Sequence, residues 1–304
     1  MRGHATKLYL STIRNLQSSL RSSNWRDPMV MYTAMILTLY ERGPQSFVDG
    51  LEHKTFRYYR INILLLYLAD RQPCFLAEAD WKSIPFSGDC PPKSVSDLLL
   101  DILVEIPGVL AAVEAMKKGE LGRYAPIQNA FEMTLWVRRL IYNLERWKED
   151  YIWTYPTICS TPTLKNIDII ALCNLGTNMV PYDVKLAEVI NLYATAHLIL
   201  ARIAHGLAER SFVFKSALRP PYGLRDLVAA IVLVSQRHIQ ANSADMVSMI
   251  VTAFPLKVAQ MTTELNEPAL LETVQGLLDR INDQFARRYN ISYSVDREAG
   301  GYGV

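Results

Sequence analysis

The chain has 304 residues, of which 50% are apolar and 20% are charged, and its formal net charge is +2. A chain of this length can bury a sizeable core, and its nearly neutral charge gives no global reason to expect nucleic-acid binding. The four cysteines lie far apart in the sequence: Cys74, Cys90, Cys159 and Cys173. This spacing argues against a zinc site or a disulfide framework and favours a reducing compartment inside the cell.

The most concentrated apolar run of the chain predicts a helix over residues 52–70. The pair Gly43-Pro44 breaks the chain before it, and Pro73 follows its end. The uncharged segment 61–69 is about half as long as a membrane span requires. We therefore expect this helix to be buried at the centre of a helical N-terminal half, residues 1–86, and not to cross a membrane.

Ser94, with Asp97 three residues later, predicts the start of the next helix through a capping box. Apolar residues continue this helix at helical spacing, and we expect a kink at Pro107. We expect residues 94–290 to pack on the first half as one domain and residues 291–304 to form a flexible tail. Helical periodicity predicts the later helices at about 126–150, 181–207, 223–241, 244–263 and 267–289.

No segment shows the alternation that is typical of a half-buried strand. The sequence therefore predicts an all-α fold, a single large irregular bundle of about nine to eleven helices without a sheet. The residues expected in its core are Phe56, Ile63, Leu66, Leu140, Leu144, Ile190, Tyr193, Leu200, Val232 and Leu277.

Four segments of the chain together carry a family resemblance. The first comprises RGPQSFVDGLEHKTFRYYR and LADRQPCFLAEADWKSIPF, within residues 42–86, where a Gly-Pro turn precedes an arginine-containing apolar helix. The others are Leu144-x-x-Trp147 followed by Pro156, the tripeptide Asn191-Leu192-Tyr193, and TAFPLKVAQ at residues 252–260. In this order they resemble the C-terminal effector domain of fungal zinc-cluster transcription factors, over nearly the whole chain.

The resemblance implies a regulatory, non-enzymatic helical domain that acts in the nucleus or the cytoplasm. Its implied partners are proteins of the transcription machinery or a second copy of the chain, and its implied context is a secondary-metabolite pathway. The chain departs from the family because it has no six-cysteine zinc cluster. It also lacks the Trp-x-x-His region that the family carries between the positions of Tyr40 and Gly43. We therefore expect no direct binding to nucleic acid or membrane, and no cofactor.

Some relatives in that family sense sterols or other small lipids in a pocket of the helical domain. In this chain, the pocket for such an apolar ligand would be lined by aromatic residues and a methionine: Tyr58, Tyr59, Trp136, Trp147, Tyr193 and Met249. Aromatic and methionine residues at helical spacing are also what an ordinary core contains, so both interpretations stay open.

A second hypothesis comes from another class of protein, the unorthodox fungal humulene cyclases, which act on farnesyl diphosphate with Mg²⁺. Those enzymes use a lysine one helical turn beyond a pocket Leu or Met, and Leu144 and Lys148 have that spacing. Their metal would be held by neighbouring acids, here Glu145, Glu149 and Asp150. The usual Asp-Asp-x-x-Asp signature is missing, and a lysine that reaches solvent from a helix end explains Lys148 equally.

Two histidines need a separate interpretation. His197 lies on the apolar stripe of its helix, and we expect a hydrogen-bonded core histidine there. Asp49 and His53 lie four residues apart, and we expect them to form a surface pair, because two groups do not make a metal site.

Overall fold

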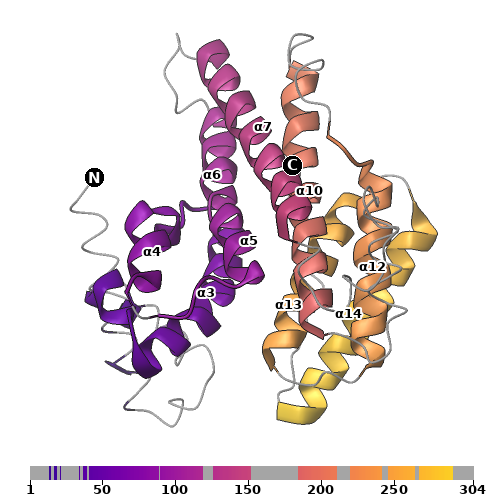
Figure 1. The fold of residues 1–304 in the computed structure, drawn as a ribbon. Coiled ribbons are helices and arrows are strands. Elements are labelled where there is room, and N and C mark those ends of the chain that lie inside the picture. The colour runs from indigo at the N-terminus through magenta and orange to yellow at the C-terminus, as the bar shows by residue number, and fades with distance from the viewer. Residues whose placement is uncertain are drawn as a thin grey trace. The chain divides into compact units, whose positions relative to one another are not determined.

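The structure is a computed structural model in which the described part of the chain is mainly helical (Figure 1). Among these residues there are nine α-helices and three short 3-10 helices, and none of them lies in a strand. The predicted all-α fold is therefore confirmed. The described residues are 41–88, 90–118, 126–151, 184–210, 220–241, 246–263 and 267–289, with 14, 17, 18, 21, 34 and 37–39. The tail predicted at 291–304 lies outside them.

The chain divides into two compact units. The smaller unit contains residues 1–63 and 75–93, and the larger one contains residues 64–74 and 94–304. Helix α3 (Gly50–Asp70) therefore contributes its first part to the smaller unit and its last residues to the larger one. It corresponds to the helix predicted at residues 52–70.

The smaller unit is built from short helices around the first part of α3. Gly43, with a φ of 70°, adopts the left-handed conformation that glycine tolerates best, and it opens the first 3-10 helix. One of the short elements precedes α3 in the sequence and three follow it. They are η2 (Pro44–Phe47), η3 (Phe75–Ala77), α4 (Ala79–Ser83) and η4 (Ile84–Phe86).

An aromatic cluster fills the core of the smaller unit. Phe56 of α3 is 0% exposed. Its ring centroid lies 5.7 Å from that of Trp81 and 6.0 Å from that of Phe86. The side chain of Arg60, also 0% exposed, places its guanidinium carbon 5.6 Å from the ring of Phe56 and 5.1 Å from that of Phe86. The interior of this unit therefore combines ring packing with cation–π contacts.

Helix α3 ends through local backbone geometry. Arg71 follows its last residue with a φ of 51°, in the left-handed region. The amide of Gln72 then donates to the carbonyl of Tyr67 at 3.2 Å, which is the long bond of a Schellman motif. Arg71 also pairs with Glu114 of the larger unit's α6, at 3.6 Å. Pro73 follows directly and prevents the helix from continuing.

The larger unit begins with α5 (Val95–Leu103) and α6 (Ile106–Lys117). The predicted capping box is confirmed, because the Ser94 hydroxyl accepts from the amide of Asp97 and the Asp97 carboxylate accepts from the amide of Ser94. The kink predicted at Pro107 is wrong. The helix breaks before that residue, and Pro107 lies in the first turn of α6, where a missing amide costs nothing.

Five long helices complete the larger unit, with α10 (Val184–Arg210) at their centre. Helix α10 contacts α5, α6, α7, α12 and α13, and Figure 1 shows it beside α7 and α12. Its segment Lys185–Glu209 is long and apolar enough to span a membrane, and 89% of the most apolar window is buried within the fold. The remaining helices are α7 (Pro126–Tyr151), α12 (Leu224–Gln240), α13 (Met246–Thr263) and α14 (Pro268–Tyr289).

The predicted core is confirmed at nine of its ten positions, since only Leu66 is half-buried. Within α3, burial extends from His53 to Leu68 and includes Ile63 and Leu64, each at most 1% exposed. The apolar periodicity of the sequence thus identifies buried positions in both units.

We predict that Phe56→Ala destabilises the smaller unit by about 3–5 kcal/mol, because the truncation leaves a cavity between aromatic rings. Urea unfolding followed by tryptophan fluorescence measures this change. Tyr58→Ala is the matched control, because Tyr58 lies on the same helix and is 53% exposed. A similar loss of stability in both variants would contradict the assignment of Phe56 to the core.

Candidate functional site

Five titratable side chains meet inside the larger unit, and we call them the Glu145 cluster. Glu145 and Lys148 lie one turn apart on α7, and Tyr193 and His197 lie one turn apart on α10. Each pair therefore shares a helix face. Tyr222 completes the cluster and lies two residues before the start of α12.

The carboxylate of Glu145 is the centre of the cluster. Lys148 Nζ donates to its Oε2 atom at 2.7 Å, and the Tyr193 hydroxyl donates to its Oε1 atom at 2.5 Å. His197 Nε2 lies 3.0 Å from the same Oε1 atom. The Tyr222 hydroxyl donates to Oε2 at 3.4 Å and accepts from Lys148 Nζ at 2.6 Å. The five groups therefore form one closed network.

These contacts keep Glu145 ionised. Burial alone would raise its pKa, but the hydrogen bonds from His197, Lys148 and Tyr193 outweigh burial and lower the pKa to about 2. For Lys148, burial alone would lower the pKa, but the bonds to Glu145 and Tyr222 outweigh it and raise the pKa. The network therefore holds one carboxylate and one ammonium in a charged pair.

The other three members are neutral at neutral pH. Burial lowers the pKa of His197, and the nearby Glu145 carboxylate offsets only part of that effect. Burial raises the pKa of Tyr193 well above 10, and Tyr222 and Glu145 add to the shift. Burial also raises the pKa of Tyr222. Both phenols therefore stay protonated and act as donors.

Aromatic packing encloses the cluster on one side. The ring centroid of Trp147 lies 5.7 Å from that of Tyr193, and its Nε1 atom donates to the carbonyl of Val95 at 3.0 Å. The rings of Tyr193 and His197 meet edge to face at 4.6 Å. Trp147 thus fixes α5, α7 and α10 together beside the polar network.

The aromatic residues predicted to line a pocket lie in several places. The structure brings Trp147 and Tyr193 together, whereas Tyr58 and Tyr59 belong to the smaller unit, with ring centroids 5.0 Å apart. Met249 belongs to α13, and its side chain lies outside the described residues.

Trp136 packs toward α6 and not toward the Glu145 cluster. Its Nε1 atom donates to Glu105 at 3.3 Å, and its ring lies so close to Gly108 that an added Cβ atom there would be 3.2 Å from it. Arg139 donates to the same Glu105 carboxylate at 2.7 Å. Trp136 therefore joins α6 to α7.

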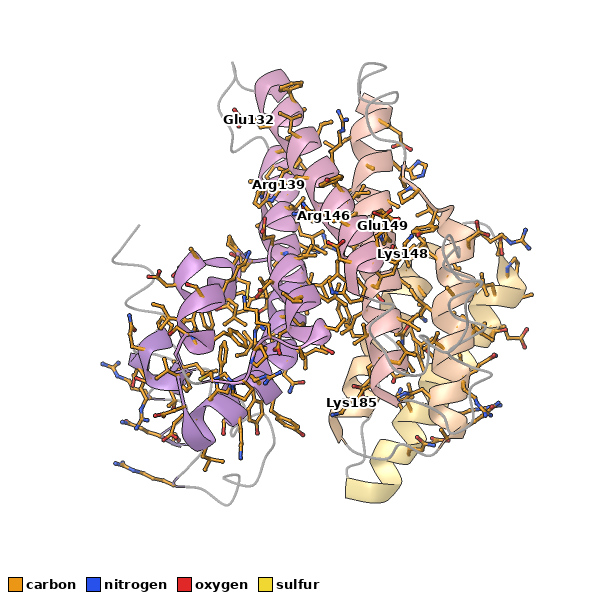
Figure 2. The ribbon with its side chains drawn as sticks, in the orientation of Figure 1. Glu132, Arg139, Arg146, Lys148, Glu149 and Lys185 are labelled. Carbon is orange, nitrogen blue, oxygen red and sulfur yellow. The ribbon has the colours of Figure 1, made fainter. Side chains whose placement is uncertain are left out.

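The three acids predicted to hold Mg²⁺ point to different partners. Glu145 accepts from the cluster, Asp150 pairs with Arg146 at 3.5 Å, and Glu149 is exposed on α7 (Figure 2). In the described part of the chain, no three His, Cys, Asp or Glu side chains lie close enough together to hold a metal ion. The predicted neighbour Leu144 is 0% exposed and packs in the core.

The expectation of a surface pair between Asp49 and His53 is wrong. His53 is 4% exposed, and its Nδ1 atom lies 3.0 Å from the carbonyl of Phe47. The thiol of Cys90 contacts the carbonyl of Val48 and lies 3.9 Å from His53 Nδ1. The expectation rested on helix spacing alone. Helix spacing does not show that the turn before α3 encloses the side chain of His53. His197, in contrast, is a buried histidine as expected.

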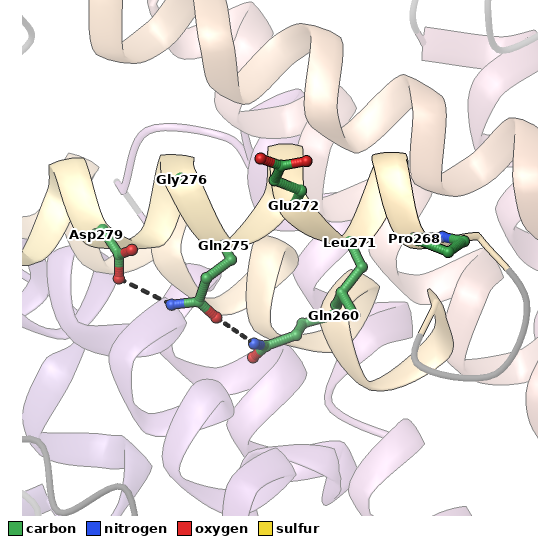
Figure 3. A pocket seen from close by; sticks show the side chains of 7 residues that line it. All are labelled: Gln260, Pro268, Leu271, Glu272, Gln275, Gly276 and Asp279. Atoms are coloured by element: carbon green, nitrogen blue, oxygen red, sulfur yellow. Dashed lines mark hydrogen bonds between the residues drawn. The ribbon is translucent and has the colours of Figure 1, made fainter.

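An open hollow lies on α14, with Gln260 of α13 at its edge (Figure 3). Gln260 donates to Gln275 at 2.6 Å, and Gln275 donates to Asp279 at 2.8 Å. Three of the side chains that line the hollow are therefore joined in one chain of hydrogen bonds. An open surface of this kind does not enclose the small apolar ligand that the sequence suggests.

In comparisons with protein-family models, curated proteins and solved structures, the chain has no significant match. The resemblance to fungal effector domains therefore remains a prediction from the sequence.

Sequence reasoning selected Lys148 and Glu145 for the cyclase hypothesis, Tyr193 as a pocket residue and His197 as a core histidine, but never the four as one group. It missed Tyr222, whose hydroxyl bonds to a residue 74 positions earlier. No local signal could have found it, because the prolines Pro220 and Pro221 restrict only their own backbone and do not reveal a partner so far away in the sequence.

We predict that Glu145→Gln lowers the free energy of unfolding by about 1–3 kcal/mol at neutral pH, because the donors of Lys148 and the tyrosines lose their ionised acceptor. The folded-state pKa of Glu145 is lowered from 4.5 to about 2. Its stabilisation is therefore complete above 4.5 and is lost as the pH falls toward 2. The difference between wild type and variant must shrink over that range, as measured by urea unfolding.

Glu149→Gln is the control for that measurement, because Glu149 is an exposed acid on the same helix. A difference between wild type and Glu145→Gln that stays constant from pH 6 to pH 2.5 would contradict the assigned role of the carboxylate.

Proposed function

We propose that the chain is a regulatory helical domain without catalytic activity of its own, similar to the effector domains of fungal zinc-cluster transcription factors. In this proposal it acts through protein contacts in the regulation of a secondary-metabolite pathway. The all-α fold agrees with the one that the resemblance implies. The four segments that carry the resemblance extend over both units.

The single observation that carries the proposal is an apolar stripe on the outer face of α7. Phe131 is 53% exposed, Leu135 is 47% exposed and Tyr142 is 62% exposed. The opposite face of the same helix is buried through Val137, Leu140 and Leu144, each 0% exposed. Clustered exposed apolar side chains on a well-packed helix are typical of a protein-interaction surface.

The state of Lys148 also supports a non-enzymatic role. A diphosphate-binding lysine must offer its ammonium group to the substrate. Here the ammonium of Lys148 bonds to Glu145 and Tyr222, and its side chain is 16% exposed. The network thus explains why a lysine lies at the end of an apolar stripe, because its charge is compensated within the fold.

We predict that the chain, fused to an unrelated DNA-binding module, changes expression of a reporter gene several-fold relative to that module alone. Leu135→Ser together with Tyr142→Ser abolishes this change, because the stripe then no longer binds its protein partner. Reporter activity at equal protein levels is the measurement. Leu51→Ser is the matched control, since Leu51 is 74% exposed on α3. A full-length, folded fusion without any effect would overturn the proposal.

The cyclase hypothesis has a direct test. We predict that the purified chain forms no hydrocarbon from farnesyl diphosphate and Mg²⁺, because Lys148 is engaged by Glu145 and Tyr222. Gas chromatography of the extracted reaction measures the product. A terpene that appears with the wild type and disappears with Lys148→Ala would replace the regulatory proposal with the enzymatic one.

A further inference from the structure

His197 is the member of the Glu145 cluster that can change its charge in mildly acidic solution. Against the effect of burial, hydrogen bonds lower the pKa of Glu145 to about 2 and raise the pKa of Lys148, so both stay charged. Burial raises the pKa of Tyr193 and of Tyr222, so both phenols stay protonated. An imidazole ordinarily gains its second proton near pH 6.5. The charge of the whole cluster therefore depends on this one ring.

The charged groups that face His197 lie on α7. Glu145 Oε1 is 3.0 Å from its Nε2 atom, and Lys148 bonds to the other oxygen of the same carboxylate. The rings of Tyr193 and Tyr222 complete its surroundings, with centroids 4.6 and 5.1 Å from that of the imidazole. Helices α5, α6, α12 and α13 also pack against α10. In the described part of the chain, none of them adds a charged group that shifts the pKa of this histidine.

The cluster is electrically neutral only while His197 is neutral, because the charges of Glu145 and Lys148 then cancel. A proton on the imidazole leaves one excess positive charge on a side chain that is 1% exposed. Burial lowers the pKa of His197, and the charge of Lys148 lowers it further, while Glu145 offsets these effects only in part. The closed cluster therefore resists the proton, and a cluster that admits water accepts it more readily.

Tyr222 is the member of the cluster that can move to admit water. It is half-buried and precedes α12, whereas the other four members lie within the long helices α7 and α10. Its ring contacts the ring of His197, and Lys148 Nζ lies 5.3 Å from its centroid. Displacement of Tyr222 would therefore expose both the buried imidazole and the ammonium group.

We propose that the Glu145 cluster is a pH-sensitive switch, in which protonation of His197 releases Tyr222 and the beginning of α12 from α7 and α10. In neutral solution the five groups stay closed. In acid the excess charge favours the open form, in which Tyr222 is displaced and water hydrates the imidazolium. The switch goes beyond the proposed function, because it concerns the interior of the larger unit and not its outer surface.

The direction of the pH effect follows from the linkage between proton binding and opening. Burial holds the pKa of His197 below 6.5 in the closed form, and exposure returns it toward that value. Opening therefore takes up a proton. The closed form has its full stability above pH 6.5 and loses stability as the pH falls below that value. One proton raises the opening equilibrium by up to about tenfold between about pH 7.5 and about pH 5.5.

Hydrogen exchange of the full chain, followed by mass spectrometry, tests the inference. After correction for the intrinsic rate, amides at residues 224–230 are expected to exchange up to about tenfold faster at about pH 5.5 than at about pH 7.5. Residues 53–60 of α3 should show no such change. His197→Gln should abolish the difference, because glutamine does not titrate. His205→Gln is the control and should keep it, because His205 is an exposed histidine on the same helix.

A second measurement does not require that His197→Gln folds. In an NMR titration of the wild type, the assigned ring protons of His197 should have a midpoint below 6.5, because burial lowers the pKa of this ring. The faster exchange at residues 224–230 should develop over the same pH range. Tyr222→Ala should move the midpoint toward 6.5, because the ring that contacts the imidazole is removed.

Four outcomes would overturn the inference. One is a corrected exchange rate at residues 224–230 that is the same at both pH values, and another is a faster exchange that persists in folded His197→Gln. The third is an equal increase in α3, because acid would then loosen the whole chain and not this cluster. The fourth is an exchange change whose pH range does not match the titration of His197.

Discussion

The packing of the larger unit depends on one ionised carboxylate, that of Glu145, between α7 and α10. Burying such a group is unfavourable unless hydrogen bonds replace its lost hydration. Lys148 on its own helix, Tyr193 and His197 on α10, and Tyr222 before α12 supply those contacts. Because the contacts come from three segments, the carboxylate fixes the rotation of α7 against α10 and the position of the chain that enters α12.

The two faces of α7 therefore have different roles. The inner face carries the buried apolar residues and the Glu145 cluster, which together hold the helix in one orientation. The outer face then presents Phe131, Leu135 and Tyr142 in a fixed arrangement. A surface that is rigid before binding loses less entropy when a partner arrives. Under the proposed function, a structural network in the interior would therefore support recognition on the outside.

Local sequence signals predicted the helices and most of the core, because helical periodicity and the Ser94 capping box depend on nearby residues only. The Glu145 cluster could not be predicted in the same way. Its bonds join residues 48 and 77 positions apart, and only the packing of α7 on α10 brings them together. The burial of His53 was missed for a related reason, since a spacing of four residues does not reveal which face the neighbouring turn covers.

The smaller unit encloses an arginine, Arg60, between the rings of Phe56 and Phe86. The planar guanidinium of an arginine is more weakly hydrated than the ammonium of a lysine, and it stacks on aromatic faces. An arginine therefore suits this position between two rings better than a lysine would.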